Sequence, residues 1–326
     1  MSSTRKRLID LLSKHEDQYI SGQQLSEELS ISRSAVWKQM NRLKQDGYEV
    51  EAVENKGYRI IDSPAKVSEN TITWGLDTAW LGHRIIHKTT IPSTQRLAHE
   101  YALDGSPHGT VIIADEQTEG KGRISRAWHS KKGTGMWMSL ILRPAILPYL
   151  APQLTLLTAT VLAEVLDGLT NVHPQIKWPN DILVQGKKTT GILTEMQAEQ
   201  DQIVYVIIGV GMNVNQQIED FPEDIKEKAT SLRAETGEKV ELNDLIQRFL
   251  ELFEKRYTTY LHEGFDRVKS SWETYGFRLK ETLQIANGNE TWEGVFLGIA
   301  EDGALLAERA DGSIEKVYSG EISWFS

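Results

Sequence analysis

The chain has 326 residues, of which 40% are hydrophobic and 25% charged, as is typical of a globular protein of two or three domains. It contains no cysteine, which excludes disulfides, thiolate nucleophiles, Fe–S clusters and Cys-ligated zinc. The net charge of −10 argues against nucleic-acid binding by the whole chain, but residues 1–66 differ, with 11 Lys or Arg against 10 Asp or Glu.

No segment of the sequence predicts insertion into a membrane. The longest apolar run, Ile203 to Val214, is shorter than the about 20 residues that cross a bilayer. The basic N-terminus "MSSTRKRLID" is not followed by the apolar core of a signal peptide. We therefore expect a soluble, cytoplasmic protein that does not bind a membrane.

Residues 1–63 have the pattern of a winged helix-turn-helix domain. Helices are expected over residues 4–14, after Ser21 as N-cap, and in "RSAVWKQMNRLKQDG", which ends at Gly47. That third segment has apolar residues at helical spacing, namely Val36, Met40 and Leu43. The segment "YEVEAVENKGYRI" then alternates, breaks at Asn55-Lys56-Gly57 and resumes, which predicts a hairpin.

The third helix has a polar outward face that suits DNA. In a helix-turn-helix, the second member enters the major groove, where Arg and Lys contact phosphates or guanine and Asn pairs with adenine. The candidate DNA-binding residues are Arg33, Ser34, Lys38, Asn41 and Arg42. Trp37 is not assigned to DNA, because it could equally pack on the first helix. The alternative interpretation is a solvated polar face on a small helical domain.

The segment "IDSPAK" (Ile61 to Lys66), with Pro64 as a breaker, is the expected linker to a domain over residues 67–273. Strands and helices mix in this domain. Strands are expected over residues 84–90, 110–117, 135–144, 175–184, 188–199 and 203–214. Helices are expected from Ser93 to Leu103, Pro152 to Leu169, Leu242 to Leu261 and Phe265 to Tyr275. Turn residues Gln185-Gly186-Lys187 predict a hairpin.

Residues 274–326 are expected to form a third domain. Short strands separated by one Asn-Gly and two Asp-Gly turns predict a small β-barrel of the SH3 type. The fold class is therefore α+β, with an N-terminal winged helix-turn-helix, a central mixed α/β domain and a C-terminal SH3-like β-barrel.

The stretch "EGKGRISRAWHS" (Glu119 to Ser130) suits an anion attached to an aromatic ring. Gly120 and Gly122 allow the backbone to approach a ligand closely. Trp128 offers a flat apolar face for a purine. Three cations can donate to carboxylate or phosphate, namely Lys121, Arg123 and Arg126. The loop is not a Walker A motif, and the alternative is an exposed basic loop without a ligand.

Two other segments carry polar groups that suggest a task. Around the hairpin lie Lys177, Asn180, Asp181, Lys187 and Lys188. Asp181 could help to hold Mg²⁺, which prefers oxygen ligands and substrate phosphates, and the alternative interpretation is a charged surface hairpin. In "PSTQ", Ser93 and Thr94 stand at a helix start, where capping alone would explain them. A helix N-terminus also accepts polar ligand atoms.

Taken together, the sequence resembles the family of bifunctional biotin–protein ligases and biotin-operon repressors. The resemblance covers nearly the whole chain and implies a central ligase domain like that of class II synthetases. It rests on five motifs, which are "STQ" (Ser93 to Gln95), "EQTEGKGRISRAW" (Glu116 to Trp128), "KWPND" (Lys177 to Asp181), "GKKTTGIL" (Gly186 to Leu193) and "GVGMNV" (Gly209 to Val214).

The resemblance implies roles for individual residues. Biotin is expected to contact Ser93, Thr94, Gln95, Gln117, Gly120, Lys121, Gly122, Arg123 and Lys188, over a floor that includes Gly209 and Gly211. ATP or the adenylate is expected to contact Arg123, Arg126, Trp128, Asn180 and Asn213. The expected catalytic residues are Lys188, Arg123 and Asp181, with Asp181 also a candidate Mg²⁺ ligand. The chain departs from the family pattern at Lys121, where arginine is common, and at Ser125, where glycine is common.

The implied reaction has two steps. The biotin carboxylate attacks the α-phosphate of ATP to give biotinyl-5′-AMP, and a lysine amine of an acceptor, such as the biotin carboxyl carrier protein of acetyl-CoA carboxylase, then takes the biotinyl group. No protein nucleophile is needed, in agreement with the absence of cysteine. The resemblance also implies that the adenylate-bound protein forms a homodimer, which represses transcription from operator DNA.

Two alternatives stay open at this point. Lipoate ligases resemble the same central fold, although the compact glycine loop and the SH3-like tail favour biotin. A biotin-sensing transcription factor without catalysis is the other, although Lys188, Asp181 and Arg123 favour an enzyme.

Overall fold

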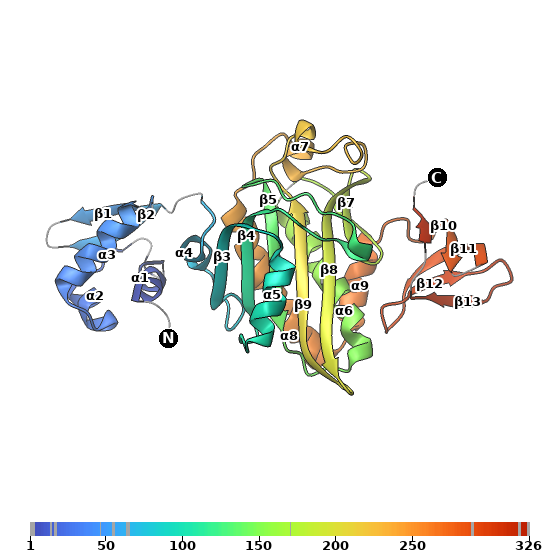
Figure 1. The fold of residues 1–326 in the computed structure, drawn as a ribbon, viewed down its shortest axis with the longest axis horizontal. Helices are drawn as coiled ribbons and strands as arrows, with labels where there is room; N and C mark the ends of the chain where they lie inside the picture. The colour runs from blue at the N-terminus through green and yellow to red at the C-terminus, as the bar shows by residue number, and fades with distance from the viewer. Residues whose placement is uncertain are drawn as a thin grey trace.

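A computed structural model describes residues 4–13, 15, 18–45, 47–53, 56–62, 66–169, 171–287, 290–318 and 321–324. Figure 1 shows a small helical part, a central sheet with helices on both faces, and a second small sheet, arranged in chain order along the longest axis. Parts of the expected elements lie outside the described residues, among them Lys14 in the first helix, Asn55 in the hairpin turn, Pro64 in the linker and Gly288 in the Asn-Gly turn.

The N-terminal part confirms the predicted winged helix-turn-helix. Helices α1 (Thr4–Ser13), α2 (Gly22–Leu29) and α3 (Arg33–Gln45) precede an antiparallel pair, β1 (Glu49–Val53) and β2 (Gly57–Asp62). Ser21 caps α2 as predicted, because its hydroxyl accepts from the Gln24 backbone N–H at 3.0 Å. Gly47 follows α3 with a φ of 99°, a conformation that favours glycine. The predicted core residues Val36, Met40 and Leu43 are fully buried.

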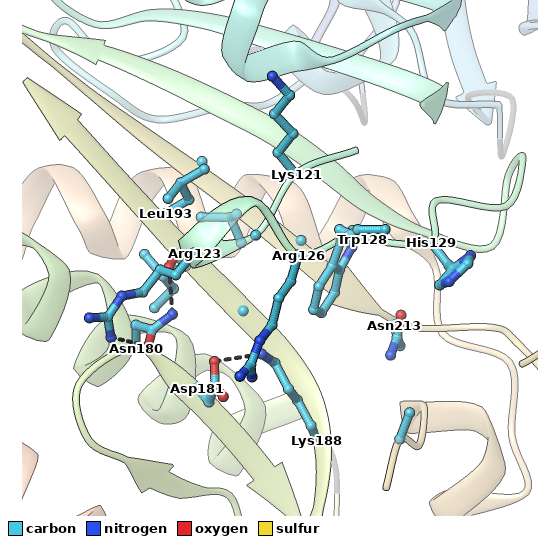
Figure 2. A pocket seen from close by; sticks show the side chains of 18 of the residues that line it. Lys121, Arg123, Arg126, Trp128, His129, Asn180, Asp181, Lys188, Leu193 and Asn213 are labelled. Atoms are coloured by element: carbon cyan, nitrogen blue, oxygen red, sulfur yellow. Dashed lines mark hydrogen bonds and ion pairs between the residues drawn. The ribbon is translucent and has the colours of Figure 1, made fainter. Parts of the chain in front are cut away.

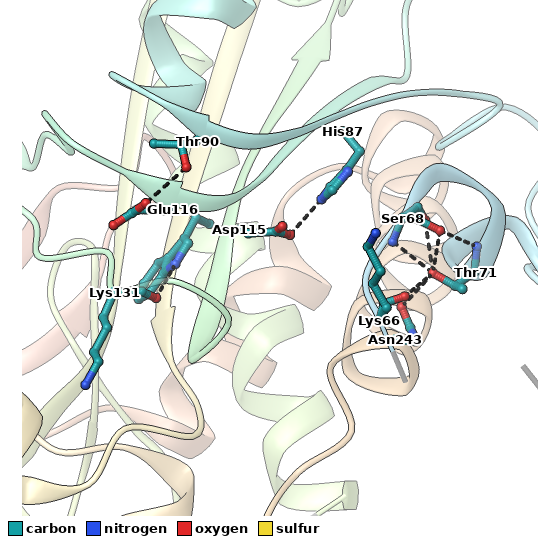
Figure 3. A network of polar contacts seen from close by, with 10 residues as sticks. Lys66, Ser68, Thr71, His87, Thr90, Asp115, Glu116, Lys131 and Asn243 are labelled. Atoms are coloured by element: carbon teal, nitrogen blue, oxygen red, sulfur yellow. Dashed lines mark hydrogen bonds and ion pairs between the residues drawn. The ribbon is translucent and has the colours of Figure 1, made fainter. Parts of the chain in front are cut away.

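A seven-stranded mixed sheet forms the centre of the molecule, in the order β3-β4-β5-β9-β8-β7-β6. The strands are β3 (Arg84–Ile91), β4 (Thr110–Gln117), β5 (Gly135–Leu142), β6 (Gln175–Lys177), β7 (Asp181–Val184), β8 (Lys187–Glu199) and β9 (Gln202–Asn213). Only β3 and β4 pair in parallel within this sheet. Polar contacts also join these two strands, His87 with Asp115 and Thr90 with Glu116 (Figure 3).

One strand prediction is wrong. Residues 175–184 were expected to form a single strand, but they form the hairpin β6–β7, in which Lys177 pairs with Asp181. Pro179 has no N–H to donate to a sheet, and it sits in the turn between the two strands. The predicted hairpin at residues 185–187 is confirmed by the pairing of Val184 with Lys187.

Helices cover both faces of the central sheet (Figure 1). Helix α5 (Thr94–Leu103) packs on one face, where Ala98 and Ala102 join a cluster with Ile141 of β5. Helices α6 (Ala151–Leu169), α8 (Leu242–Glu263) and α9 (Asp266–Tyr275) pack on the other, where Leu140 joins the main core. Since side chains alternate along a strand, Ser139 lies on the side of α5.

Within the described part of the chain, one segment, Pro148–Leu169, is long and apolar enough to cross a membrane. Its most apolar window is 72% buried inside the protein. This apolar character is what a central core helix requires, because α6 is covered on several sides by the sheet, α8 and α9.

Two short helices were not predicted, α4 (Glu69–Thr73) and α7 (Leu232–Thr236). Ser68 and Thr71 form a capping box at the start of α4, and the Thr71 hydroxyl donates to Asn243 Oδ1 at 3.2 Å (Figure 3). This bond joins the segment after the linker to the first turn of α8. Single 3₁₀ turns occur at Arg123–Ser125, Pro148–Leu150 and Ile218–Asp220.

The C-terminal part is an antiparallel sheet with the order β13-β12-β11-β10-β14. Its strands are β10 (Thr282–Asn287), β11 (Glu290–Ile299), β12 (Leu305–Glu308), β13 (Ile314–Val317) and β14 (Glu321–Ser323). Trp178, in the β6–β7 turn, donates from Nε1 to Gly303 O at 3.0 Å. This contact joins the sheet to the central part. Closure into an SH3-like barrel, the synthetase-like class of the central part and the three domain boundaries stay predictions.

Candidate functional site

A cavity of about 560 Å³ lies at the N-terminal end of α5. Its walls come from α5, loop 117–130, β5, the β6–β7 turn, β8, β9 and β14, so segments far apart in sequence build it. Small-molecule sites commonly have volumes of about 300–1,000 Å³. The cavity is therefore large enough for an organic ligand of moderate size.

One end of the cavity is a buried, neutral polar network. Ser139 Oγ lies 2.9 Å from Thr94 Oγ1 and 3.1 Å from Gln95 Oε1. Gln117 Oε1 accepts from the backbone N–H and the hydroxyl of Thr94, at 2.8 and 3.0 Å. Ser93 stands at the N-cap of α5 but makes no side-chain cap bond, so capping does not account for its hydroxyl. This end can bind a neutral head group through hydrogen bonds.

Glycines form the floor because side chains lie directly on them. A methyl group at Gly209 would stand 2.5 Å from Gln95 Oε1, and one at Gly211 would stand 2.5 Å from Trp128 Nε1. A methyl group at Gly191 would stand 3.0 Å from the Trp128 ring. The indole of Trp128 therefore lies flat over two neighbouring strands. Trp128 Nε1 is buried and has no hydrogen-bond partner among the described residues.

The other end of the cavity is cationic (Figure 2). Lys188 Nζ lies 2.6 Å from Asp181 Oδ1, in an ion pair that lacks hydrogen-bond geometry, and Lys177 Nζ lies 3.7 Å from Asp181 Oδ2. Burial lowers the pKa of Lys177, and Asp181 opposes that shift. Arg123 donates to Asn180 Oδ1 at 3.0 Å. In Figure 2, Arg126 also reaches towards Asp181 and Lys188. Because Asp181 is the single carboxylate among these wall residues, against two lysines and two arginines, this end suits a ligand with several negative charges.

The side chains here do not fit a resident Mg²⁺ ion. The part of the chain that the structure describes contains no group of three or more His, Asp or Glu side chains placed to hold a metal. The carboxylate of Asp181 is engaged by two lysines, which would compete with the ion. Mg²⁺ is commonly bound through one or two carboxylates together with substrate phosphates, and here the phosphates would have to supply most of the ligands.

Backbone bonds hold the glycine loop against the cavity. Gly122 N donates to Arg126 O at 2.7 Å, and Trp128 N donates to Gly120 O at 2.8 Å. A methyl group at Gly120 would stand 2.4 Å from Trp128 O, so glycine is needed there to close the loop on itself. At the tip, Ile124 has a φ of 53° and is 85% exposed.

The cavity walls contain every residue predicted to bind biotin or the adenylate except Gly120. Lys121 lines the cavity but points away from Asp181 and Lys188 in Figure 2. The amide of Asn213 is already used, since it donates to Thr230 O and accepts from Gln216. Wall residues absent from the predicted set include Lys177, Ser139, Gly191, Phe221, Lys228 and Trp324. Ser139 gave a signal, as the one hydroxyl in a strand of otherwise apolar residues and glycine.

The helix proposed to read DNA presents its polar face to solvent. Arg33, Ser34, Lys38 and Arg42 on α3 are exposed, and Asn41 is half-buried. Trp37 is 57% exposed, so it does not pack away against α1. The spacing of the apolar residues on α3 therefore leaves the cationic side free.

Comparison with known proteins matches all three parts of the chain. Residues 4–59 match the HTH domain, residues 88–213 the biotin/lipoate A/B protein ligase family, and residues 282–324 the biotin protein ligase C-terminal domain. The bifunctional ligase/repressor BirA of Bacillus spizizenii is 49% identical over 98% of both chains. The chain belongs to the BirA family of bifunctional ligase/repressors. BirA of Escherichia coli is 30% identical over 97% of this chain and 96% of its own.

A solved structure supports the same assignment for most of the chain. The biotin protein ligase from Aquifex aeolicus, determined in complex with biotin and ATP, is 30% identical with a TM-score of 0.63. The match covers 74% of this chain and 98% of the Aquifex aeolicus chain. The BirA-family assignment thus rests on the sequence over 98% of the chain and on the fold over 74% of it.

Proposed function

We propose that this BirA-family chain attaches biotin to a lysine of an acceptor carrier protein in an ATP-dependent reaction, and represses transcription through operator DNA. Membership of the family gives it both the ligase and the repressor role. The observation that carries the ligase mechanism is one cavity with a buried neutral end and a cationic end. Biotin has a neutral ureido head and an anionic tail, and ATP adds further negative charge.

We assign the biotin head to the neutral end. Ser93, Thr94, Gln95 and Gln117 would bind it, above Gly209 and Gly211. Its carboxylate would then extend towards Lys188, at the start of the cationic end. The triphosphate, and later the adenylate, would meet Arg123, Arg126 and Asn180, with the adenine near Trp128 and with Asn213 at the edge of this region.

In the first step, a biotin carboxylate oxygen forms a bond to the α-phosphorus of ATP while the bond to pyrophosphate breaks. Two anions must approach each other, so catalysis depends on cations that are already in place. Lys188 and Arg123 are assigned this role. Asp181 is assigned the role of holding Lys188, given the 2.6 Å ion pair.

In the second step, the neutral amine of the acceptor lysine attacks the acyl carbon and AMP leaves with the bonding electrons. The amine loses one proton to solvent as the amide forms. The biotinyl-adenylate intermediate is open to hydrolysis, so a loop that covers it would protect it from water. Loop 119–130 is proposed to serve as that cover.

We propose that Mg²⁺ arrives bound to the ATP phosphates, because the surrounding side chains form no carboxylate cage of their own. The ion would supply charge neutralisation on the phosphates. A cytoplasmic location, as predicted, would give the protein access to both its acceptor and its operator.

For repression, we propose that the adenylate-bound chain forms a homodimer that sets two winged helices on a two-fold-symmetric operator. The residues assigned to DNA are Arg33, Ser34, Lys38, Asn41 and Arg42, on the exposed face of α3. Sedimentation with and without biotin and ATP tests the assembly.

The test of the ligase function is incubation with biotin, ATP and an acceptor domain, with pyrophosphate release and the mass of the acceptor as readouts. Lipoate in place of biotin tests the alternative, since the matched ligase family includes lipoate ligases. The match of residues 282–324 to a biotin ligase C-terminal domain favours biotin. Pyrophosphate release with lipoate but not with biotin would reject biotin as the substrate.

A further inference from the structure

The side-chain amide of Gln95 is held from outside the cavity. Gln95 Nε2 donates to Glu195 Oε2 at 2.9 Å and lies 3.4 Å from Leu193 O. Its oxygen, Oε1, lies on the opposite side, near Ser139 Oγ and above Gly209. Gln95 is buried, with a relative exposure of 6%.

The partners determine which way round the amide stands. An ionised carboxylate and a backbone carbonyl both accept hydrogen bonds and donate none. The amide nitrogen must therefore face Glu195 and Leu193, and the oxygen must face the cavity. If the amide were reversed, its oxygen would oppose two other acceptors, and repulsion would replace two bonds.

Around Ser139, the neutral end of the cavity then has more acceptor oxygens than hydroxyl protons to satisfy them. The Thr94 hydroxyl donates to Gln117 Oε1, and the Ser139 hydroxyl has one proton for two acceptors, Thr94 Oγ1 and Gln95 Oε1. A buried acceptor without a donor costs about 1–3 kcal/mol. A ligand that brings its own N–H group removes this deficit.

Glu195 is itself oriented by a second side chain. His99 Nε2 lies 3.0 Å from Glu195 Oε2, and His99 Nδ1 lies 3.3 Å from the Tyr205 hydroxyl. His99 is one helical turn after Gln95 on α5, so both face the same part of β8. Neither His99 nor Glu195 is among the residues that line the cavity.

We propose that Glu195, supported by His99, is a positioning residue that makes the cavity selective for a head group with an N–H donor. It acts through Gln95, whose oxygen it turns towards the ligand. The ureido group of biotin carries such donors, and the dithiolane ring of lipoate does not. This inference rests on the proposed function and adds a physical basis for its substrate choice.

The test compares Glu195→Ala with the unaltered full-length chain by titration calorimetry. The probes are biotin and its two mono-N-methylated isomers, each of which lacks one ureido N–H. The unaltered protein should bind biotin at least about 10-fold more tightly than one of these isomers. In Glu195→Ala this ratio should fall towards one, through weaker binding of biotin.

Three controls separate positioning from a general loss of structure. Glu195→Gln, which can still offer Gln95 an acceptor oxygen, should recover most of the ratio. Glu199→Ala removes an exposed carboxylate from the same strand and should leave the ratio unchanged. The KM for ATP and the unfolding temperature should match those of the unaltered chain, because the Glu195 side chain is 47% exposed.

Equal weakening of biotin and both isomers, an unchanged ratio in Glu195→Ala, or no discrimination by the unaltered chain would each overturn the proposal. If the unaltered chain binds no biotin at all, the proposed function fails instead. The two failures are thus distinguishable in one set of titrations.

Discussion

Replacing Lys188 with alanine removes the cation assigned to the first chemical step. Its ammonium lies at the cavity, 2.6 Å from Asp181 and 5.3 Å from the centre of the Trp128 ring. We expect Lys188→Ala to slow adenylate formation while leaving the fold intact. The prediction separates a role in chemistry from a role in packing.

The expected size follows from the position of the side chain. A unit charge about 4 Å from another contributes ~4 kcal/mol at an effective dielectric constant of ~20. The Lys188 side chain is 34% exposed, so we take solvent to screen about half of this, which leaves ~2 kcal/mol and a loss of ~30-fold in kcat/KM. For stability, Asp181 keeps Lys177 as a partner at 3.7 Å, and the change should be within ~1 kcal/mol.

The assay is pyrophosphate release with saturating ATP and varied biotin, alongside thermal unfolding. Lys187→Ala is the matched control, because Lys187 is the neighbouring hairpin lysine and does not line the cavity. If Asp181 acts by holding Lys188, Asp181→Asn added to Lys188→Ala should cost little more than Lys188→Ala alone. A collapse of thermal stability together with activity, or a loss of activity below ~3-fold, would refute the reasoning.

Three further perturbations test other parts of the molecule. Gly211→Ala should displace the Trp128 indole, because a methyl group at this position would stand 2.5 Å from its Nε1. Calorimetry in the presence of biotin should then show ATP binding weakened by at least ~10-fold. Unchanged ATP binding would contradict the assignment of Gly211 to the cavity floor. Deletion of residues 1–66 should abolish operator binding in a gel-shift assay and leave adenylate formation unchanged. Loss of both activities would argue against the domain division. Operator binding by the full chain should weaken steeply as the salt concentration rises. Burial raises the pKa of Tyr260 to about 12 from 10.0, so the folded state holds its proton between these values while the unfolded state releases it. Stability should therefore fall as pH rises from about 10 to about 12, and Tyr260→Phe should show a smaller fall in the unfolding temperature over that interval.

Much of the fold could be predicted because most elements are long and periodic. The predominantly apolar run from Pro152 to Leu169 becomes the core helix α6, and the continuous apolar run that begins at Ile203 becomes β9. Helices α4 and α7 were missed because five residues are too few to show a period. The β6–β7 hairpin was missed because Pro179 was included in a strand that it cannot continue.

The cavity was only partly predictable, for a different physical reason. The loop residues and the "KWPND" residues can be recognised in the sequence, because charged residues and glycines cluster at neighbouring positions there. Glu195 and His99 have no such signal, since their contacts depend on how α5 crosses β8. Trp324 reaches the wall only because the C-terminal sheet docks on the central part. Residues whose role depends on how distant segments pack together cannot be identified from the spacing of residues along the chain.

Loop 119–130 can connect the two roles of the protein because it borders the cavity and also exposes an apolar residue at its tip. It directs Arg126 and Trp128 to the cavity, where a bound adenylate would change the charge balance. Ile124, at the tip, also borders the cavity but is 85% exposed, in a left-handed backbone conformation that a β-branched residue adopts only under constraint. A ligand can shift assembly only by binding one arrangement of such an element more tightly than another. Since the cations that would bind the adenylate and the exposed apolar tip belong to one short loop, ordering of the first necessarily restricts the second.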